Sequence, residues 1–139
     1  MRRVTHLGDA WATIGAALLV ATIEPALGAA MLLANALSHV PVQLLKRLVA
    51  RPRPSDALGR PLALVPLPDP FSFPSGHAAA TTAVAATLVM AHPVTAPLAL
   101  PIAGLVSYSR FALRVHHASD VLAGNALGLA GALAARVLL

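Results

Sequence analysis

Apolar residues along this chain form five long stretches, and polar residues are concentrated in the segments between them. Because the polar residues are clustered and not periodic, the stretches lack the polar face of a soluble surface helix. A bilayer-spanning helix needs about 20 residues, with about 17 tolerated, so four stretches qualify while the first is short. The pattern predicts an all-α bundle of about five transmembrane helices, over Ala10–Ile23, Ala26–Val49, Ser75–Ala91, Ala96–Leu113 and Ser119–Leu139.

Two kinds of connection separate the stretches. Short polar segments predict tight helical turns at Glu24-Pro25, Ala91–Thr95 and Arg114–Ser119. The segment Ala50–Phe73 is different, because together with Pro74 it holds seven of the twelve prolines and cannot be helical. It predicts one long Pro-rich loop, and long loops often carry function.

Composition supports a membrane protein over a soluble one. Hydrophobic residues make up 58% of the 139 residues and charged residues 11%, and the mean hydropathy is +0.76. A soluble chain this short would need polar helix faces to cover its core. There is no cysteine, which excludes disulfides, thiolate chemistry and cysteine metal sites. We expect residues 1–139 to form a single membrane-embedded domain.

Charge is distributed unevenly between the two ends of the predicted bundle. With five spans, the N-terminus, the long loop and the turn Arg114–Ser119 share one membrane face. Nine of the ten basic residues lie on that face, which leaves only Arg136 opposite. Such a positive face is expected to attract an anion. The nine residues are Arg2, Arg3, Lys46, Arg47, Arg51, Arg53, Arg60, Arg110 and Arg114.

The first of three polar clusters on this face is Lys46–Pro54, "KRLVARPRP". Its two prolines hold the backbone extended, so that Arg53 projects from a stiff stem. Arginine suits bidentate phosphate binding. The alternative is that these residues are ordinary lipid-headgroup anchors beside a membrane span.

The second cluster, "PSGH", begins the third predicted helix. Pro74 suits the first turn, which leaves Ser75, Gly76 and His77 where unpaired N–H groups and the helix dipole attract anions. Glycine lets an oxyanion approach the backbone closely. His77 could bind the same anion or give it a proton, or it could be only a cap or surface residue.

The third cluster, "SRFALRVHHASD", contains a histidine and a carboxylate at helical spacing. His116 and Asp120 are four residues apart, so the carboxylate could hold the imidazole in one tautomer and leave the other nitrogen as a nucleophile toward phosphorus. His117, three residues from Asp120, is a rival that spacing disfavours only modestly. Asp120 could instead serve only as a cap of the fifth helix.

Together the three clusters resemble the signature of the type-2 phosphatidic acid phosphatase superfamily, K-x6-RP, PSGH and SR-x5-H-x3-D. Every position matches in order and spacing, and the resemblance spans residues 46 to 120, with "LAGNALG" after it also similar. It selects His116 over His117. The matching residues are Lys46, Arg53, Pro54, Pro74, Ser75, Gly76, His77, Ser109, Arg110, His116 and Asp120.

The resemblance implies hydrolysis of a phosphate monoester or diphosphate through a phosphohistidine, with no metal and no cofactor. It implies that His116 attacks phosphorus, that Asp120 stabilises the imidazolium and that His77 protonates the leaving oxygen. The implied phosphate site consists of Lys46, Arg53, Ser75, Gly76 and Arg110, with backbone N–H groups near Ser75 and Gly76.

Three classes of function remain in competition. The leading one is a membrane lipid phosphatase, for which undecaprenyl diphosphate, phosphatidic acid and phosphatidylglycerol phosphate are all suitable substrates. A vanadate-dependent haloperoxidase would share the pocket, but such enzymes are soluble and larger. A non-catalytic protein that binds anionic lipid would not need the nucleophile, acid and carboxylate together. A nucleic acid is not expected as a partner.

The expected location is a bacterial-type inner membrane, crossed several times, and two arguments disagree on sidedness. Without Lys46, Arg53 and Arg110, six basic residues on the motif face oppose one, so the positive-inside rule favours a cytoplasmic site. Many bacterial proteins with this resemblance act on the outer face, and we expect an outward site. Many members have six spans, so this chain is a minimal form or lacks an N-terminal helix.

Polar and small residues inside the spans have structural interpretations. Four polar residues of the second span are expected to make interhelical hydrogen bonds, with substrate contact as the alternative: Asn35, Ser38, His39 and Gln43. Three glycines of the last span predict close helix packing, within the monomer or between protomers of a homo-oligomer: Gly124, Gly128 and Gly131.

Overall fold

The structure is a computed structural model that describes residues 1–56, 58–67 and 69–139. Ala57 and Pro68 of the predicted long loop lie outside the described residues. The helices lie close to the predicted stretches, which confirms an all-α chain with five helices. The five α-helices are α1 (Ala10–Ala21), α2 (Pro25–Val49), α3 (Gly76–Ala91), α4 (Ala96–Ala112) and α5 (Ala118–Leu138), and the two short 3-10 helices are η1 (Val4–Gly8) and η2 (Pro93–Thr95).

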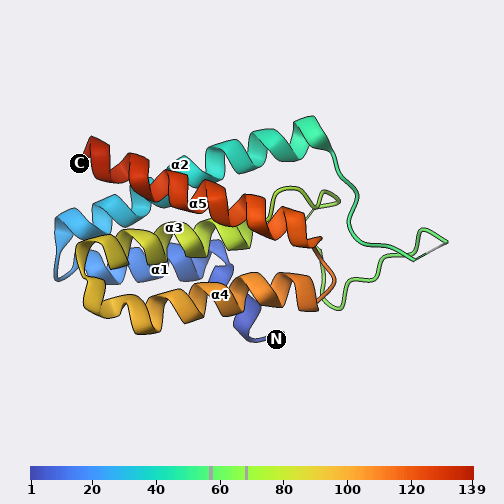
Figure 1. Cartoon of the computed structure of the whole chain (residues 1–139), viewed down its shortest axis with the longest axis horizontal. Helices are drawn as coiled ribbons and strands as arrows, with labels where there is room; N and C mark the ends of the chain where they lie inside the picture. The colour runs from blue at the N-terminus through green and yellow to red at the C-terminus, as the bar shows by residue number, and fades with distance from the viewer. Residues whose placement is uncertain (57, 68) are drawn as a thin grey trace.

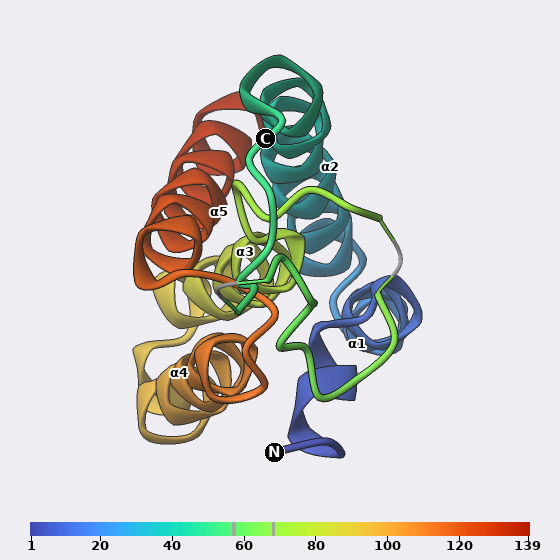
Figure 2. The same cartoon turned by 90° about the vertical axis from the view of Figure 1, so that its right-hand side faces the viewer.

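The five α-helices run side by side along the long axis (Figure 1). Viewed from one end, α3 lies in the middle, and it contacts each of the other four (Figure 2). The long loop and the turn before α5 lie at one end, and the C-terminus lies at the other (Figure 1). The N-terminal residues reach the loop end, since Thr5 accepts a hydrogen bond from Arg110 and Asp9 contacts His77. The predicted sharing of one face is therefore confirmed as an arrangement of the helices.

Small residues allow the helices around α3 to approach closely. A Cβ on Gly124 would collide with the carbonyl oxygen of Ser75, and one on Gly128 with that of Ala79. A Cβ on Gly131 would lie 2.6 Å from the carbonyl oxygen of Ala34 in α2. The glycine face of α5 therefore packs within the monomer, which is the first of the two predicted alternatives.

The boundaries of α2 and α3 determine where the site forms. Pro25 begins α2, and Ala50 ends it in the left-handed region with φ 45°. The helix α3 begins at Gly76 with Ser75 as its N-cap, and Pro74 follows a cis peptide bond before the cap. The prediction that Pro74 lies in the first turn is therefore wrong, because the helix begins two residues later.

The outer surface of the bundle is apolar. By length and composition, α2 and α5 qualify as membrane spans, and α1 and α3 are shorter apolar helices. Large hydrophobic side chains are exposed on the outward faces, which a soluble chain would avoid. Examples are Leu18, Leu19, Leu44, Leu98, Leu105, Leu122 and Leu133.

Candidate active site

A cavity of about 460 Å³ opens at the loop end of the bundle. Residues from η1, α1, α2, the long loop, α3, α4 and the turn before α5 line it, so the fold gathers positions that are more than 100 residues apart in sequence. The cavity contains one histidine from each of the second and third clusters and all three predicted phosphate-binding cations. These residues are Lys46, Arg53, His77, Arg110 and His116.

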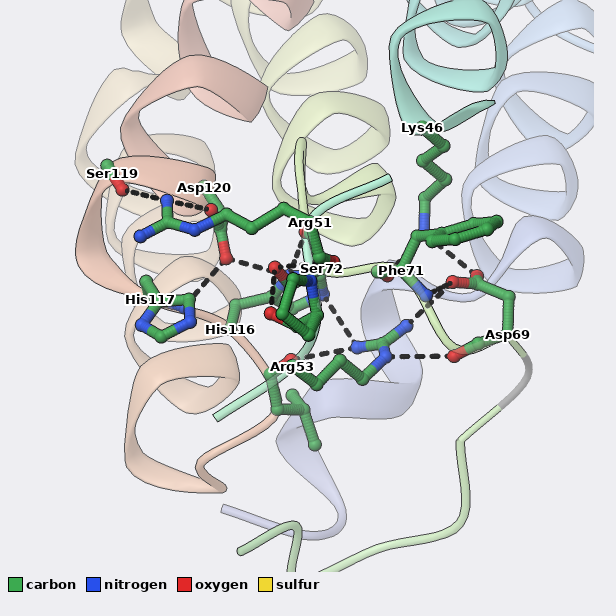
Figure 3. Close-up of polar contacts among 12 residues, drawn as sticks. Lys46, Arg51, Arg53, Asp69, Phe71, Ser72, His116, His117, Ser119 and Asp120 are labelled. Atoms are coloured by element: carbon green, nitrogen blue, oxygen red, sulfur yellow. Dashed lines mark hydrogen bonds and ion pairs between the residues drawn. The ribbon is translucent and has the colours of Figure 1, made fainter. Parts of the chain in front are cut away.

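The first cluster supplies two cations that share one carboxylate (Figure 3). Lys46 Nζ donates to Asp69 Oδ2 at 2.8 Å, and Arg53 Nη2 donates to Asp69 Oδ1 at 3.1 Å. Burial alone would raise the pKa of Asp69, but the hydrogen bond and charge of Lys46 and the charge of Arg53 hold it below its ordinary value. Lys46 and Arg53 are buried, and ordinary headgroup anchors would be exposed. The headgroup-anchor alternative is therefore wrong for these two residues.

His116 is buried beside Arg53 and oriented by the long loop. Its Nδ1 lies 2.6 Å from the carbonyl oxygen of Ser72, so Nδ1 carries the proton and Nε2 keeps the lone pair. Asp120 Oδ2 is 3.8 Å from Nδ1. The expectation that Asp120 fixes the tautomer is thus wrong, because Ser72 makes the closer contact. Arg53 Nη1 approaches Nε2 at 3.4 Å and donates to the carbonyl oxygen of Val115 at 2.8 Å.

The environment of His116 favours its neutral form. Burial, together with the charges of Arg53 and Arg110, lowers the pKa of His116 below its ordinary value and outweighs the opposing effects of Asp120 and the Ser72 carbonyl. A neutral imidazole has the lone pair that a nucleophile requires.

Asp120 has a capping contact as well as its place near His116. Its Oδ2 accepts the backbone N–H of His117 at 2.8 Å, and its Oδ1 accepts from Arg51 Nη1 at 2.9 Å. Capping and proximity to His116 therefore coexist. The side chain of His117 does not line the cavity, and that of His116 does.

At the N-terminal end of α3, one of the predicted N–H groups is already bonded within the protein, and two buried polar atoms of the motifs have no partner. The Ser75 N–H donates to the carbonyl oxygen of Asp120 at 2.9 Å, so its predicted use for an anion is wrong. Among buried side-chain polar atoms of the described residues, Ser75 Oγ and Arg110 Nε are the two without a hydrogen-bond partner. Leaving a buried polar atom unpaired costs about 1–3 kcal/mol. Both atoms belong to the recognised motifs.

His77 has a partner that the sequence did not indicate. Its Nε2 lies 2.8 Å from Oδ1 of Asp9, whose other oxygen contacts His6 Nδ1 at 2.8 Å and Trp11 Nε1 at 3.1 Å. Burial alone would raise the pKa of Asp9, but the hydrogen bonds of His6 and His77 hold it below its ordinary value. A cap or surface role alone for His77 does not fit this contact, since the ring is part-buried in the cavity.

The polar residues of α2 differ in whether their hydrogen bonds reach another helix. Asn35 donates to Thr13 Oγ1 in α1 at 3.0 Å, as predicted for an interhelical bond. Ser38 donates to the carbonyl oxygen of Asn35, and Gln43 pairs with His39 at 3.1 Å, both within α2. The interhelical prediction is therefore wrong for Ser38, His39 and Gln43. His39 and Gln43 line the cavity.

Sequence reasoning missed five residues that contact the motif residues: Thr5, Asp9, Arg51, Asp69 and Ser72. The motif residues that they contact lie 16 to 105 residues away, so no local spacing could indicate them. Only one signal was available: Asp9 and Asp69 are acidic residues on the strongly basic face.

Known proteins resemble this chain in sequence and in structure. It is 37% identical over 134 residues to the decaprenylphosphoryl-5-phosphoribose phosphatase of Mycobacterium tuberculosis, covering 91% of this chain and 72% of that protein. It is 33% identical over 119 residues to the undecaprenyl-diphosphatase of Sulfolobus acidocaldarius, covering 85% of this chain and 58% of that protein.

The crystal structure of a transmembrane PAP2-type phosphatidylglycerolphosphate phosphatase from Bacillus subtilis superposes with a TM-score of 0.79 at 28% identity, covering 99% of this chain and 73% of that one. With the apolar outer surface described above, this likeness identifies the chain as an integral membrane protein. Residues 26–139 match the profile of the PAP2 superfamily, which is the family that the three motifs indicate. The chain belongs to the PAP2 superfamily.

Proposed function

We propose that this chain is a membrane lipid phosphatase that transfers the phosphoryl group of its substrate to His116 and then to water, without a metal. The observation that carries the proposal is that three cations and two histidines of the three motifs line one cavity: Lys46, Arg53, His77, Arg110 and His116. A phosphate bound among these cations would offer an acceptor to Arg110 Nε, a buried donor that has no partner among the described residues. Relatives named as polyprenyl-linked phosphatases support a lipid substrate.

In the first half-reaction the neutral His116 Nε2 attacks phosphorus in line. The Nε2–P bond forms as the bond to the leaving oxygen breaks, and protonated His77 gives its proton to that oxygen. The Nδ1 proton stays on the ring, hydrogen-bonded to the Ser72 carbonyl, while Asp120 at 3.8 Å offsets the new positive charge. Asp9 holds His77 in place.

In the second half-reaction His77, now neutral, takes a proton from a water molecule. The water attacks phosphorus, the Nε2–P bond breaks and inorganic phosphate leaves. The equatorial oxygens would be held by Lys46, Arg53, Ser75, Gly76 and Arg110. Because Asp69 already contacts Lys46 and Arg53, the substrate phosphate must share or displace that carboxylate.

In the proposed membrane arrangement all five helices span the bilayer, and residues 1–139 act as one domain. The cationic end would then face the headgroup region. The cavity continues from that end to Ile14 and Leu32, an apolar wall between α1 and α2 that suits a lipid chain. The motif face would lie outside the inner membrane.

The test is phosphate release by the purified protein in detergent with EDTA present. Wild-type protein should release phosphate from at least one of undecaprenyl diphosphate, phosphatidic acid and phosphatidylglycerol phosphate. His116→Ala should lower turnover by at least about 10³-fold, as expected when a covalent nucleophile is lost. His117→Ala is the matched control and should remain active. Unchanged turnover in His116→Ala, or complete loss on adding EDTA, would rule out the mechanism.

A further inference from the structure

The α2 wall of the cavity carries polar side chains that the phosphoryl-transfer mechanism does not use. Asn35, His39 and Gln43 are four residues apart, so they follow one face of α2, and all three line the cavity. Gln43 is exposed and His39 half-buried, on a helix that qualifies as a membrane span. Polar side chains are costly in that environment, so their presence points to a polar ligand.

His39 and Gln43 together offer one donor and one acceptor. Their side-chain nitrogens lie 3.1 Å apart. If Gln43 donates to His39 Nε2, the remaining groups are the Nδ1–H donor and the amide oxygen; if the amide is turned, they are the amide N–H donor and the Nδ1 acceptor. Either assignment suits a hydroxyl group, which both donates and accepts. A phosphate oxygen can only accept.

His39 lies next to the first turn of α3, which carries His77. A Cβ on Gly76 would be 3.7 Å from His39 Cε1, so the imidazole is next to the residue that precedes His77. In the proposed function His77 protonates the leaving oxygen. Because His39 and His77 line the same cavity, the group that carries the phosphate would lie in the cavity that His39 also lines.

The charged residues that line the cavity disfavour the binding of a second phosphate group. Three cations line the cavity, but so do two carboxylates, Asp9 and Asp69. Asp69 contacts Lys46 and Arg53, and Asp9 contacts His77 itself. A diphosphate substrate would bring its second phosphate group toward Asp9, where like charges repel. The cations of α2 nearest to His39 and Gln43 are Lys46, which is already paired with Asp69, and Arg47, which is not among the described residues that line the cavity.

We propose that His39 and Gln43 form a subsite for a hydroxyl-bearing sugar or polyol, so that the preferred substrate is a lipid whose terminal phosphate monoester is attached to such a group. This inference rests on the proposed function and narrows its substrate class. The phosphate next to a polyprenyl chain in a diphosphate, and the ester groups of phosphatidic acid, lack the hydroxyl that the pair would bind.

The test compares kcat/KM for four lipids in mixed micelles: a polyprenyl-phosphoryl-pentose phosphate, phosphatidylglycerol phosphate, phosphatidic acid and undecaprenyl diphosphate. The first two should exceed the last two by about tenfold, which corresponds to one or two neutral hydrogen bonds. Their order separates a sugar from a polyol. Gln43→Leu should reduce the preference several-fold, and His39→Phe gives an independent measurement. Leu48→Ala, also exposed on α2 but outside the cavity, is the matched control and should keep the preference.

The outcomes separate the two proposals. Release of phosphate from all four lipids without preference, preference for the diphosphate, or an unchanged preference in both variants would overturn the subsite and leave the phosphatase function standing. No release from any of the four would overturn both.

Discussion

The two ends of the bundle each hold a histidine–carboxylate contact between the N-terminal part of the chain and α3 or its end. At the loop end His77 and Asp9 are 2.8 Å apart, and at the far end His92 and Glu24 are 3.0 Å apart. The side chains are 21% and 27% exposed in the first pair and 42% and 50% in the second. Only the first pair shares a cavity with buried cations and a second histidine.

The difference shows that a histidine–carboxylate contact is not by itself a catalytic feature. Exposed pairs are screened by water and contribute little. At the loop end, burial strengthens each interaction. The buried Arg110 there has an Nε donor without a partner, which a bound anion would satisfy. Of the Lys and Arg residues that the structure describes, only Arg136 lines the hollow beside Glu24, and it is exposed.

After His116→Ala, the substitution Asp120→Asn at the loop end should cause the largest loss of turnover. It keeps the shape of the side chain and much of its capping geometry, but it removes the charge 3.8 Å from His116 Nδ1 that offsets the imidazolium. We expect turnover to fall by about 100-fold or more. The measurement is kcat for the folded fraction, with the thermal transition followed in parallel. Reduced thermal stability with near-normal kcat would show that Asp120 is only a cap and an ion-pair partner of Arg51.

Asp9→Asn and Glu24→Gln test the comparison of the two pairs directly. Asp9→Asn weakens the contact that holds His77 and removes a charge that favours its protonated form, so we expect kcat to fall by about tenfold, with KM measured alongside. Glu24→Gln makes the equivalent change at the exposed pair and should leave both measurements unchanged. Equal effects of the two substitutions would contradict a special role for the loop-end pair.

The pH dependence of kcat/KM sharpens the description of His116. Its neutral form is the nucleophile, and its pKa is lowered from 6.5 by burial and by Arg53 and Arg110. The fraction of neutral His116 should therefore stay high as the pH falls to 6.5, and the acid limb should appear only below that value. An acid limb above pH 6.5 would mean that the opposing effects of Asp120 and Ser72 dominate in solution.

The sequence predicted what is local and missed what is tertiary. The helix boundaries followed from apolar length and proline, and the motif residues Lys46, Arg53, His77, Arg110 and His116 do meet in one cavity. Helical spacing led to Asp120 as the partner of His116 Nδ1. The turn before α5 instead presents that nitrogen to Ser72, 44 residues earlier, and such a contact depends on how the long loop folds back. The same reason explains why Asp9 and Asp69 were not predicted.

The two ends of the bundle must face opposite sides of the membrane, and chemical labelling can show which end faces which side. The chain has no cysteine, so a single one can be placed at either end. Leu58 in the long loop is 77% exposed, and Val94 in the turn between α3 and α4 at the far end is 87% exposed. With the motif face outside, Leu58→Cys in intact cells should react with a membrane-impermeant maleimide, and Val94→Cys should react only after permeabilisation.

The positive-inside rule predicts the reverse, because six basic residues remain on the motif face when Lys46, Arg53 and Arg110 are set aside as ligands of the substrate. Residues of a long loop count less toward that rule, and Arg51, one of the six, is paired with Asp120 beside the site. Labelling of Leu58→Cys only in permeabilised cells, with Val94→Cys labelled in intact ones, would place the site in the cytoplasm.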